Sequence, residues 1–347
     1  MSEQQFPWRA GTATGVGSMP GTDPVEACRV VFGELPDLPY LPELPDRGPG
    51  ADITGRAAAL LIGLPVQITP AGWKFTDRPG RDLTRAAGYW SQDLDTLEET
   101  AVGYTGPLKL QVCGPWTLAA TLELSHSASP ALSDPGAVAD LTASLAEGLA
   151  AHAADVRKRV PGATLVVQID EPSLPAALAG RLPTASGLGT VAPVDRIIAS
   201  QRLATVLAAP SAATVVHCCG PVAAVFPEIR AAGATAVSFD LSQLPVRETD
   251  RISELAEAGL GLLVGALPMV TAARLGTGPP LQPRQTAAAV VAMWRRTGLS
   301  PGLLAGQVVL TPACGLAGLS PAAATAALRH CREAARVAAE MTEENSP

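Results

Sequence analysis

The sequence predicts an α/β fold, a (β/α)8 barrel of the TIM type in a single domain. Within its 347 residues, eight short runs rich in Val, Ile and Leu alternate with longer Ala-rich stretches. Apolar strands separated by helices indicate a parallel sheet covered on both faces. Polar or reactive residues also follow several of these strands, as a barrel requires to gather them at one mouth. An open doubly wound sheet competes with the barrel, and periodicity does not exclude it.

The expected strands are short apolar runs at 12–17, 38–41, 108–113, 164–169, 213–217, 234–239, 261–265 and 307–310. The expected helices are at 24–32, 97–102, 137–160, 194–208, 222–232, 251–258, 285–296 and 321–341. Pro321 suits the first turn of the last helix, and Ser320 suits its N-cap. The segment 58–97 is too long for one crossover helix. We expect it to form an insertion over the mouth, with a strand at 66–69 and a hairpin return at 70–77. The tail 343–347 is expected to fray.

Composition excludes several classes of protein. The net charge is −7 and no basic stripe is present, so nucleic acid is not an expected partner. The longest apolar runs, such as 259–270, are too short to span a bilayer, and the N-terminus does not resemble a secretory signal. A cytoplasmic location is expected, where disulfides are disfavoured. Each of the six cysteines is then an apolar filler, a metal ligand or a reactive thiol.

A metal site is the sharpest expectation from the strand ends. His217 and Cys219 are separated by one residue, so their side chains leave the same face of a strand. Cys314, after the last strand, would complete a set of two sulfurs and one nitrogen, with Asp240 as an oxygen donor. Imidazole and thiolate ligands select Zn²⁺. The alternative is that both cysteines are small buried residues and that His217 is a core histidine.

Other strand ends carry carboxylates and a glycine-rich turn. Asp170 and Glu171 follow an apolar strand and would bind a cationic group or act in acid–base chemistry. Equally, Asp170 would cap a turn and Glu171 would be solvated. Glu43 is a lone carboxylate among prolines, more structural than functional on this evidence. The segment 15–18 offers backbone N–H groups to a carboxylate or phosphate, or is simply a turn.

Three further groups of residues have simpler expected roles. Basic residues near the insertion are expected on a solvated face: Arg47, Arg56, Lys74, Arg78 and Arg81. Two tryptophans, Trp73 and Trp116, are expected near a ligand. Three other cysteines, Cys28, Cys218 and Cys331, are expected in the core.

Taken in order, these motifs resemble the C-terminal catalytic barrel of cobalamin-independent methionine synthase. The order is G-V-G-S at 15–18, Pro-Glu at 42–43, G-P-x-T at 114–117, Q-I-D-E-P at 168–172, H-x-C at 217–219 and P-x-C-G-L at 312–316. The resemblance spans nearly the whole chain and places it in a superfamily that also contains uroporphyrinogen decarboxylase. It implies a zinc-dependent methyltransferase that converts homocysteine to methionine.

The resemblance also implies a role for each matching residue. His217, Cys219 and Cys314 match zinc ligands, and Asp240 stands nearest to a fourth ligand that is Glu in the family. Val16, Gly17 and Ser18 match the loop that holds the homocysteine carboxylate. Asp170 and Glu43 match the carboxylates that take its ammonium.

The chain departs from this family in the residues that serve folate. Ala176 stands where the family has a pterin-binding Glu, and Thr121 stands where it has a Trp. The family's proton-donating His has no counterpart, and the chain is about half the family's usual length. These departures lead us to expect a donor other than methyltetrahydrofolate, with a methyl-corrinoid or a corrinoid protein as the hypothesis.

Two alternatives remain open at this point. One is a uroporphyrinogen decarboxylase-like enzyme, which would need arginines at the mouth, whereas only Arg9 lies near the first expected strand. The other is a non-catalytic barrel that binds zinc or a partner.

Overall fold

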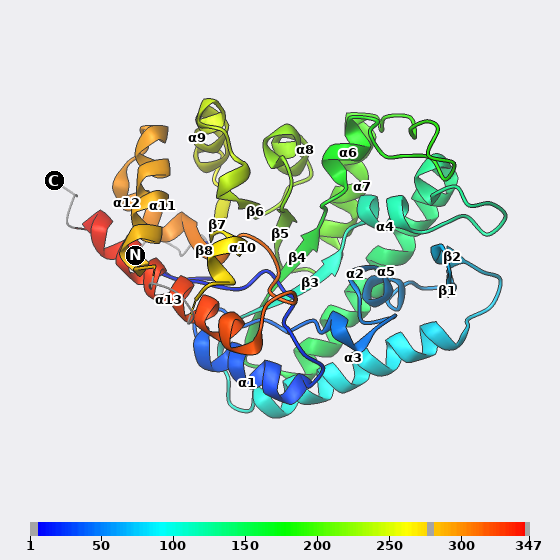
Figure 1. Ribbon diagram of the computed structural model, residues 1–347, viewed down its shortest axis with the longest axis horizontal. Helices are drawn as coiled ribbons and strands as arrows, with labels where there is room; N and C mark the ends of the chain where they lie inside the picture. The colour runs from blue at the N-terminus through cyan, green and yellow to red at the C-terminus, as the bar shows by residue number, and fades with distance from the viewer. Residues whose placement is uncertain (1–5, 276–280, 344–347) are drawn as a thin grey trace.

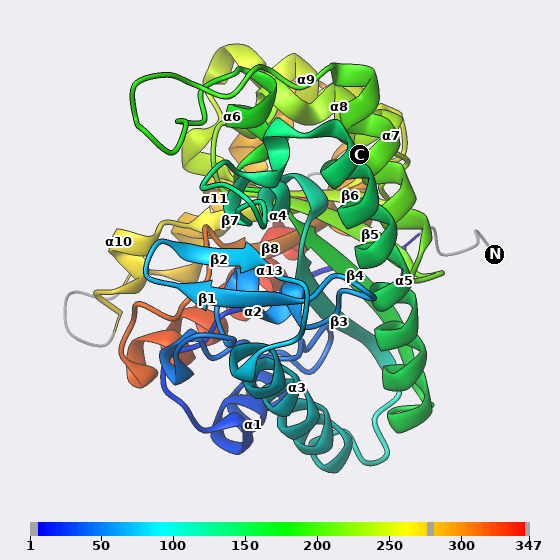
Figure 2. The same cartoon turned by 90° about the vertical axis from the view of Figure 1, so that its right-hand side faces the viewer.

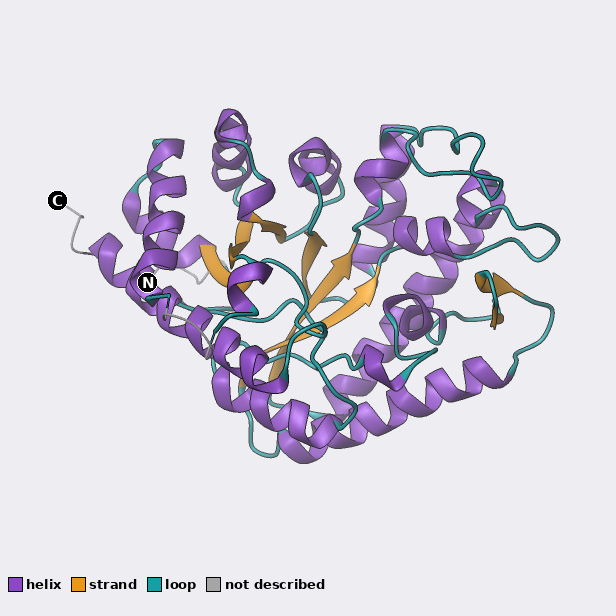
Figure 3. Ribbon diagram, viewed as in Figure 1, coloured by secondary structure: helices purple, strands orange, loops and turns teal. Residues whose placement is uncertain are grey.

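A curled sheet of six parallel strands forms the centre of the computed structural model, which describes residues 6–275 and 281–343. The strands pair in chain order: β3 (Gly106–Cys113), β4 (Ala163–Asp170), β5 (Ala213–Cys218), β6 (Ala236–Asp240), β7 (Gly261–Leu267) and β8 (Val308–Pro312). Helices surround this sheet (Figure 1), and the strands lie inside them (Figure 3). Every residue of β7 and β8 is buried, as expected for a parallel sheet covered on both faces.

The helices agree with the sequence in order but are more numerous than expected. The longer ones are α1 (Pro24–Glu34), α3 (Arg81–Thr100), α5 (Pro135–Arg159), α7 (Arg196–Ala208), α9 (Thr249–Glu257), α11 (Pro283–Thr297) and α13 (Pro321–Glu343). The short ones are α2 (Ile53–Ala58), α4 (Pro115–Thr121), α6 (Leu174–Leu178), α8 (Phe226–Ala231), α10 (Met269–Ala272) and α12 (Pro301–Gln307). Of the tail expected to fray, residues 344–347 lie outside the described part of the chain.

The first two expected strands are not assigned as strands, so within the described residues the central sheet has six strands and a full eight-stranded barrel is not confirmed. Both segments nevertheless lie along its edges through isolated parallel bridges. Ala13 pairs with Leu310 of β8, and Tyr40 pairs with Lys109 of β3. A third bridge joins Ser18 to Glu43, so the two segments also contact each other. The chain therefore runs around a barrel-like ring, but the arc from 12 to 43 is held by few ladder bonds.

The expected hairpin is confirmed: β1 (Val66–Thr69) pairs antiparallel with β2 (Gly72–Phe75). It is anchored to the segment that follows α4, because Phe75 N–H donates to Glu123 O at 3.0 Å and Glu123 N–H donates to Trp73 O at 2.9 Å. In Figure 2 the hairpin lies in front of the sheet. This position agrees with an insertion beside the mouth. That the whole chain forms one domain stays a prediction.

Candidate active site

The carboxyl ends of β4, β5 and β8, together with the arc 16–53, enclose a cavity of about 350 Å³. We call it the acceptor pocket. The predicted site residues that line it are Val16, Gly17, Ser18, Glu43, Asp170, His217, Cys219 and Cys314. The register of the sheet explains part of this convergence, since Asp170 at the end of β4 pairs directly with His217 of β5.

The imidazole and the two thiols meet inside this pocket. Cys314 hydrogen-bonds with both Cys219 and His217, and these bonds lower the pKa of Cys314. The same pairing raises the pKa of Cys219. His217 Nδ1 bonds Ser238 Oγ at 2.9 Å, so the ring orientation is fixed and Nε2 is the nitrogen left to face Cys314.

As placed, these side chains are joined by hydrogen bonds and do not have the spacing of a metal ligand set. Among the described residues, no group of three or more His, Cys, Asp or Glu side chains has that spacing. Asp240 is not among the residues lining the acceptor pocket. Its Oδ1 accepts the N–H of Ser242 at 2.8 Å, which caps the short helix that follows β6.

The loop at 16–18 is held tightly while its N–H groups stay unused. Glu43 N–H donates to Gly17 O at 3.1 Å, and Leu316 N–H donates to Ser18 O at 2.8 Å. A Cβ at Gly315 would lie 2.1 Å from Ser18 Oγ, so a larger residue at this position would displace the Ser18 hydroxyl. The N–H groups of Gly17 and Ser18 have no hydrogen-bond partner within the described chain. They remain available to an anion.

Glu43 and Asp170 are buried carboxylates, with 8% and 6% exposure respectively. Burial raises the pKa of Glu43 to about 7, against the opposing effect of Arg56, whose Nε lies 3.5 Å from Glu43 Oε1. Burial also raises the pKa of Asp170, although the nearby His217 and Gln168 favour its ionised form. Two carboxylates held in a poorly solvated pocket would gain from a bound ammonium group.

Lys109 is a residue of this site that the sequence reasoning missed. It is fully buried on β3, and its Nζ donates to Val16 O at 2.8 Å and to Gln111 Oε1 at 3.2 Å. Burial lowers its pKa to about 8, while Asp170 and Glu43 favour the charged form. A lysine within an apolar strand was the available signal, since Lys109, Gln111 and Cys113 share one face by the alternation of a strand.

Glu171 has a structural role instead of being solvated. It is fully buried and accepts hydrogen bonds from Trp116 N–H at 2.9 Å, Thr117 N–H at 2.8 Å and Thr117 Oγ1 at 2.7 Å. These bonds satisfy the first N–H groups of α4. A Cβ at Gly114 would lie 2.3 Å from Glu171 Oε1, so glycine is needed before this helix.

The expectation of a solvated face was wrong for two arginines. Arg47 and Arg56 are buried and share the carboxylate of Asp93, with Arg47 Nη1 at 2.7 Å and Arg56 Nη1 at 2.6 Å. Trp73 donates its indole N–H to Asp52 at 3.3 Å, and Asp52 lines the acceptor pocket. Trp116 lines a different cavity, described below. The core cysteines are confirmed: Cys28, Cys218 and Cys331 are buried.

The fold and this pocket define a barrel-like α/β enzyme with a thiol- and imidazole-lined site at the carboxyl ends of its strands. The chain belongs to the family described as cobalamin-independent synthase, catalytic domain, which matches residues 127–337, more than half of the sequence. It is therefore a methionine synthase-like catalytic domain of the methyltransferase class. The family description gives no support to the corrinoid donor expected from the sequence.

Two solved structures share the fold. One is a B12-independent methionine synthase from Shewanella sp. W3-18-1 in complex with selenomethionine, with a TM-score of 0.61, 14% identity, and coverage of 96% of this chain and 98% of that one. The other is a methyltransferase from Methanosarcina mazei, with a TM-score of 0.58, 14% identity, and coverage of 96% and 94%. At this identity they show a common fold only. No curated protein sequence matches the chain. The described residues contain no helix long and apolar enough to cross a membrane.

Proposed function

We propose that this protein is a zinc-dependent thiol methyltransferase that converts homocysteine to methionine. One observation carries the proposal: three of the four predicted metal donors, His217, Cys219 and Cys314, line the same cavity as the predicted amino-acid-binding groups, although the two sets are far apart in sequence. Family membership supplies the class of reaction. A single domain at residues 1–347, containing the insertion at 58–97, is part of the proposal.

The donor set favours zinc. His217, Cys219 and Cys314 offer one imidazole nitrogen and two sulfurs, a combination typical of zinc sites. Ser238, which bonds Nδ1 of His217, is the kind of outer partner that orients a ligating histidine. Asp240 stays a prediction as the fourth ligand, because its carboxylate accepts the N–H of Ser242 and would have to turn away from it to reach a metal. Bound zinc supplies positive charge that favours the thiolate form of a sulfur ligand near neutral pH.

The remaining groups fit the two charged ends of an amino acid. Gly17 and Ser18 present free N–H groups to its carboxylate, and Glu43 and Asp170 present buried oxygens to its ammonium. An amino acid held by these two groups would have its thiol sulfur toward Cys219 and Cys314. Methylation forms a bond from that sulfur to the methyl carbon and breaks the bond from the methyl carbon to the donor. The bonding electron pair leaves with the donor, and the thiol proton passes to solvent.

Zinc content and catalysis are tested on the full chain. We expect about one zinc per wild-type chain by elemental analysis, and methionine formation from homocysteine with methyltetrahydrofolate triglutamate and methylcobalamin supplied in parallel assays. Methyltetrahydrofolate triglutamate should be a poor donor, because Ala176 and Thr121 stand where the family has its folate-binding residues. Cys219→Ser and Cys314→Ser each remove a thiolate ligand and should lower turnover by a factor on the order of a thousand or more.

Cys331→Ser is the matched control, because Cys331 is a buried free cysteine on α13, away from the pocket. It should retain zinc and turnover. Equal zinc content in wild type and in both pocket variants would contradict the metal assignment. Asp240→Ala tests whether Asp240 contributes to the metal site. A fall in zinc affinity of about tenfold to a hundredfold would indicate that Asp240 either binds the metal or orients one of its ligands.

A further inference from the structure

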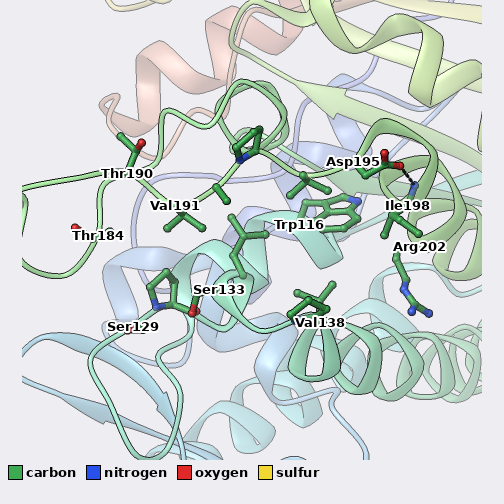
Figure 4. Close-up of a pocket in the computed structure, with 16 residues that line it drawn as sticks. Trp116, Ser129, Ser133, Val138, Thr184, Thr190, Val191, Asp195, Ile198 and Arg202 are labelled. Atoms are coloured by element: carbon green, nitrogen blue, oxygen red, sulfur yellow. Dashed lines mark hydrogen bonds between the residues drawn. The ribbon is translucent and has the colours of Figure 1, made fainter.

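A second cavity, of about 570 Å³, lies apart from the acceptor pocket and shares none of its lining residues. We call it the apolar cavity. It is formed by Trp116 at the start of α4, the segment 129–138 that leads into α5, the loop 184–195, and the first turns of α7 (Figure 4). Its volume lies within the range of small-molecule sites, which is about 300–1,000 Å³.

The walls of this cavity are held by hydrogen bonds, so the space does not depend on loose side chains. The indole N–H of Trp116 donates to Ala199 O at 3.1 Å, which fixes the ring against α7. The loop is closed by two backbone bonds, from Val191 N to Leu182 O at 2.8 Å and from Thr184 N to Gly189 O at 2.9 Å. A preformed cavity lowers the cost of ordering protein groups when a ligand binds.

The lining is mainly apolar and includes Leu132, Val138, Val191 and Ile198 together with three prolines. Ile198 keeps 42% of its surface exposed, although it is a large aliphatic residue that lines the cavity. An apolar lining of this size favours an aromatic or alkyl body over a strongly hydrated ligand.

Two charged residues line the cavity, and within the described chain only one of them, Asp195, forms hydrogen bonds. Asp195 Oδ1 accepts the N–H groups of Ile197 at 2.8 Å and Ile198 at 3.1 Å, and so caps α7. Arg202 is half-buried one helical turn beyond Ile198, and within the described chain it has no hydrogen bond or ion pair. Figure 4 shows it at the end of the cavity opposite Thr184 and Thr190. A guanidinium placed beside an apolar wall suits an anionic group on the ligand.

We propose that the apolar cavity binds a small amphiphilic anion, with its aromatic or alkyl body against Trp116 and Ile198 and its anionic group at Arg202. This inference goes beyond the methyltransferase site and does not depend on zinc or on homocysteine. Binding is therefore measured on the full chain with neither present, so that its failure leaves the proposed function intact.

The probes are a matched pair, 8-anilinonaphthalene-1-sulfonate and N-phenyl-1-naphthylamine, which share one aromatic body and differ by the sulfonate. Both fluoresce more strongly in apolar surroundings. We expect saturable binding, with the sulfonate about tenfold tighter than its neutral partner. In Arg202→Met the two affinities should become equal through weakening of the sulfonate alone. Unchanged sulfonate affinity in Arg202→Met, or no binding of either probe to wild type, would overturn the proposal.

Two neighbouring isoleucines provide a second, independent test. Ile197 and Ile198 are both exposed in the first turn of α7, but only Ile198 lines the cavity. Ile198→Gln should weaken both probes several-fold, and Ile197→Gln should change neither. Circular dichroism and thermal unfolding verify that each variant folds. Equal binding by both variants and wild type would indicate adventitious surface adsorption and would overturn the assignment.

Discussion

The acceptor pocket and the apolar cavity lie in the same molecule but are stabilised by different physics. Around the acceptor pocket, three buried cations face three buried carboxylates: Arg47, Arg56 and Lys109 with Glu43, Asp93 and Asp170. The apolar cavity has aliphatic walls, backbone hydrogen bonds and two lining charges. Full ionisation leaves the first group electrically balanced, so a zwitterionic amino acid would enter it without adding net charge. Among the described residues, the second has one cation without an ion-pair partner, that of Arg202, and favours an anion.

The difference follows from which parts of the chain build each site. Much of the acceptor pocket is built at strand ends, where the pairing register of the sheet determines which residues lie next to each other. Loops and helix starts build the apolar cavity, where the position of each side chain depends on tertiary packing. Substitutions on the charged side should therefore have large and specific effects, and those on the apolar side small and local ones.

The largest effect on stability is expected at Asp93, which receives both arginines. Asp93→Asn keeps the shape but leaves two buried guanidiniums with one carboxylate nearby, that of Glu43. Removing one partner of a buried ion pair costs about 3–5 kcal/mol. Urea unfolding measures this loss. Glu26→Gln breaks a solvent-exposed pair with Arg29 and should change stability little, because water screens the interaction. Similar losses in both variants would remove the proposed contrast.

The next effect is a pH dependence at His152, whose ring lies 4.3 Å from that of Trp90. Burial, reinforced by Arg56, lowers the pKa of His152 from 6.5 to about 4. Between pH 6.5 and about 4, His152 therefore binds a proton more readily in the unfolded chain than in the native protein. As a result, the native state loses stability as pH falls from 6.5 toward 4. This loss approaches about 3 kcal/mol below the lower value.

His152→Leu should remove that contribution. Its stability relative to wild type should rise as pH falls from 7 to 4.5, as measured by urea unfolding at each pH. His126→Leu is the control, because His126 is exposed and no other group of the described chain hydrogen-bonds to its ring. A constant difference between wild type and His152→Leu across this range would show that the ring titrates normally in the native protein.

Much of the acceptor pocket was predictable because its donors follow apolar strands, as His217, Cys219, Asp170 and Cys314 do. The two first strands were overpredicted, since apolar composition does not reveal whether a segment pairs along its length or only at Ala13 and Tyr40. The roles of Arg56 and Glu171 were missed because burial of a charge depends on a distant partner. The apolar cavity was missed for the same reason: Trp116 and Ile198 are 82 positions apart.

A smaller effect is expected at Lys109, a positioning residue in the proposed function. The ammonium of Lys109 donates a hydrogen bond to Val16 O. It also lies near Glu43 and Asp170, the two carboxylates that would bind the ammonium of the substrate. Lys109→Met should displace the loop at 16–18 and raise KM for homocysteine about tenfold to a hundredfold, or about 1.4–2.8 kcal/mol. A fall in kcat with unchanged KM would contradict this role. Lys109→Arg, which keeps the charge, should recover part of the affinity.

The smallest effects on stability are expected at two helix caps, one beside each cavity. Asp195 caps α7 beside the apolar cavity, and Asp52 caps α2 beside the acceptor pocket by accepting the N–H groups of Thr54 and Gly55. Asp195→Ala should cost about 1 kcal/mol, the usual value of one cap. Asp52→Ala should cost more, about 2 kcal/mol, because Trp73 also loses the acceptor for its indole N–H. Urea unfolding of both variants measures the gap. Equal losses would mean that the tryptophan bond adds nothing, and a larger loss at Asp195 would reverse the contrast between the charged side and the apolar side.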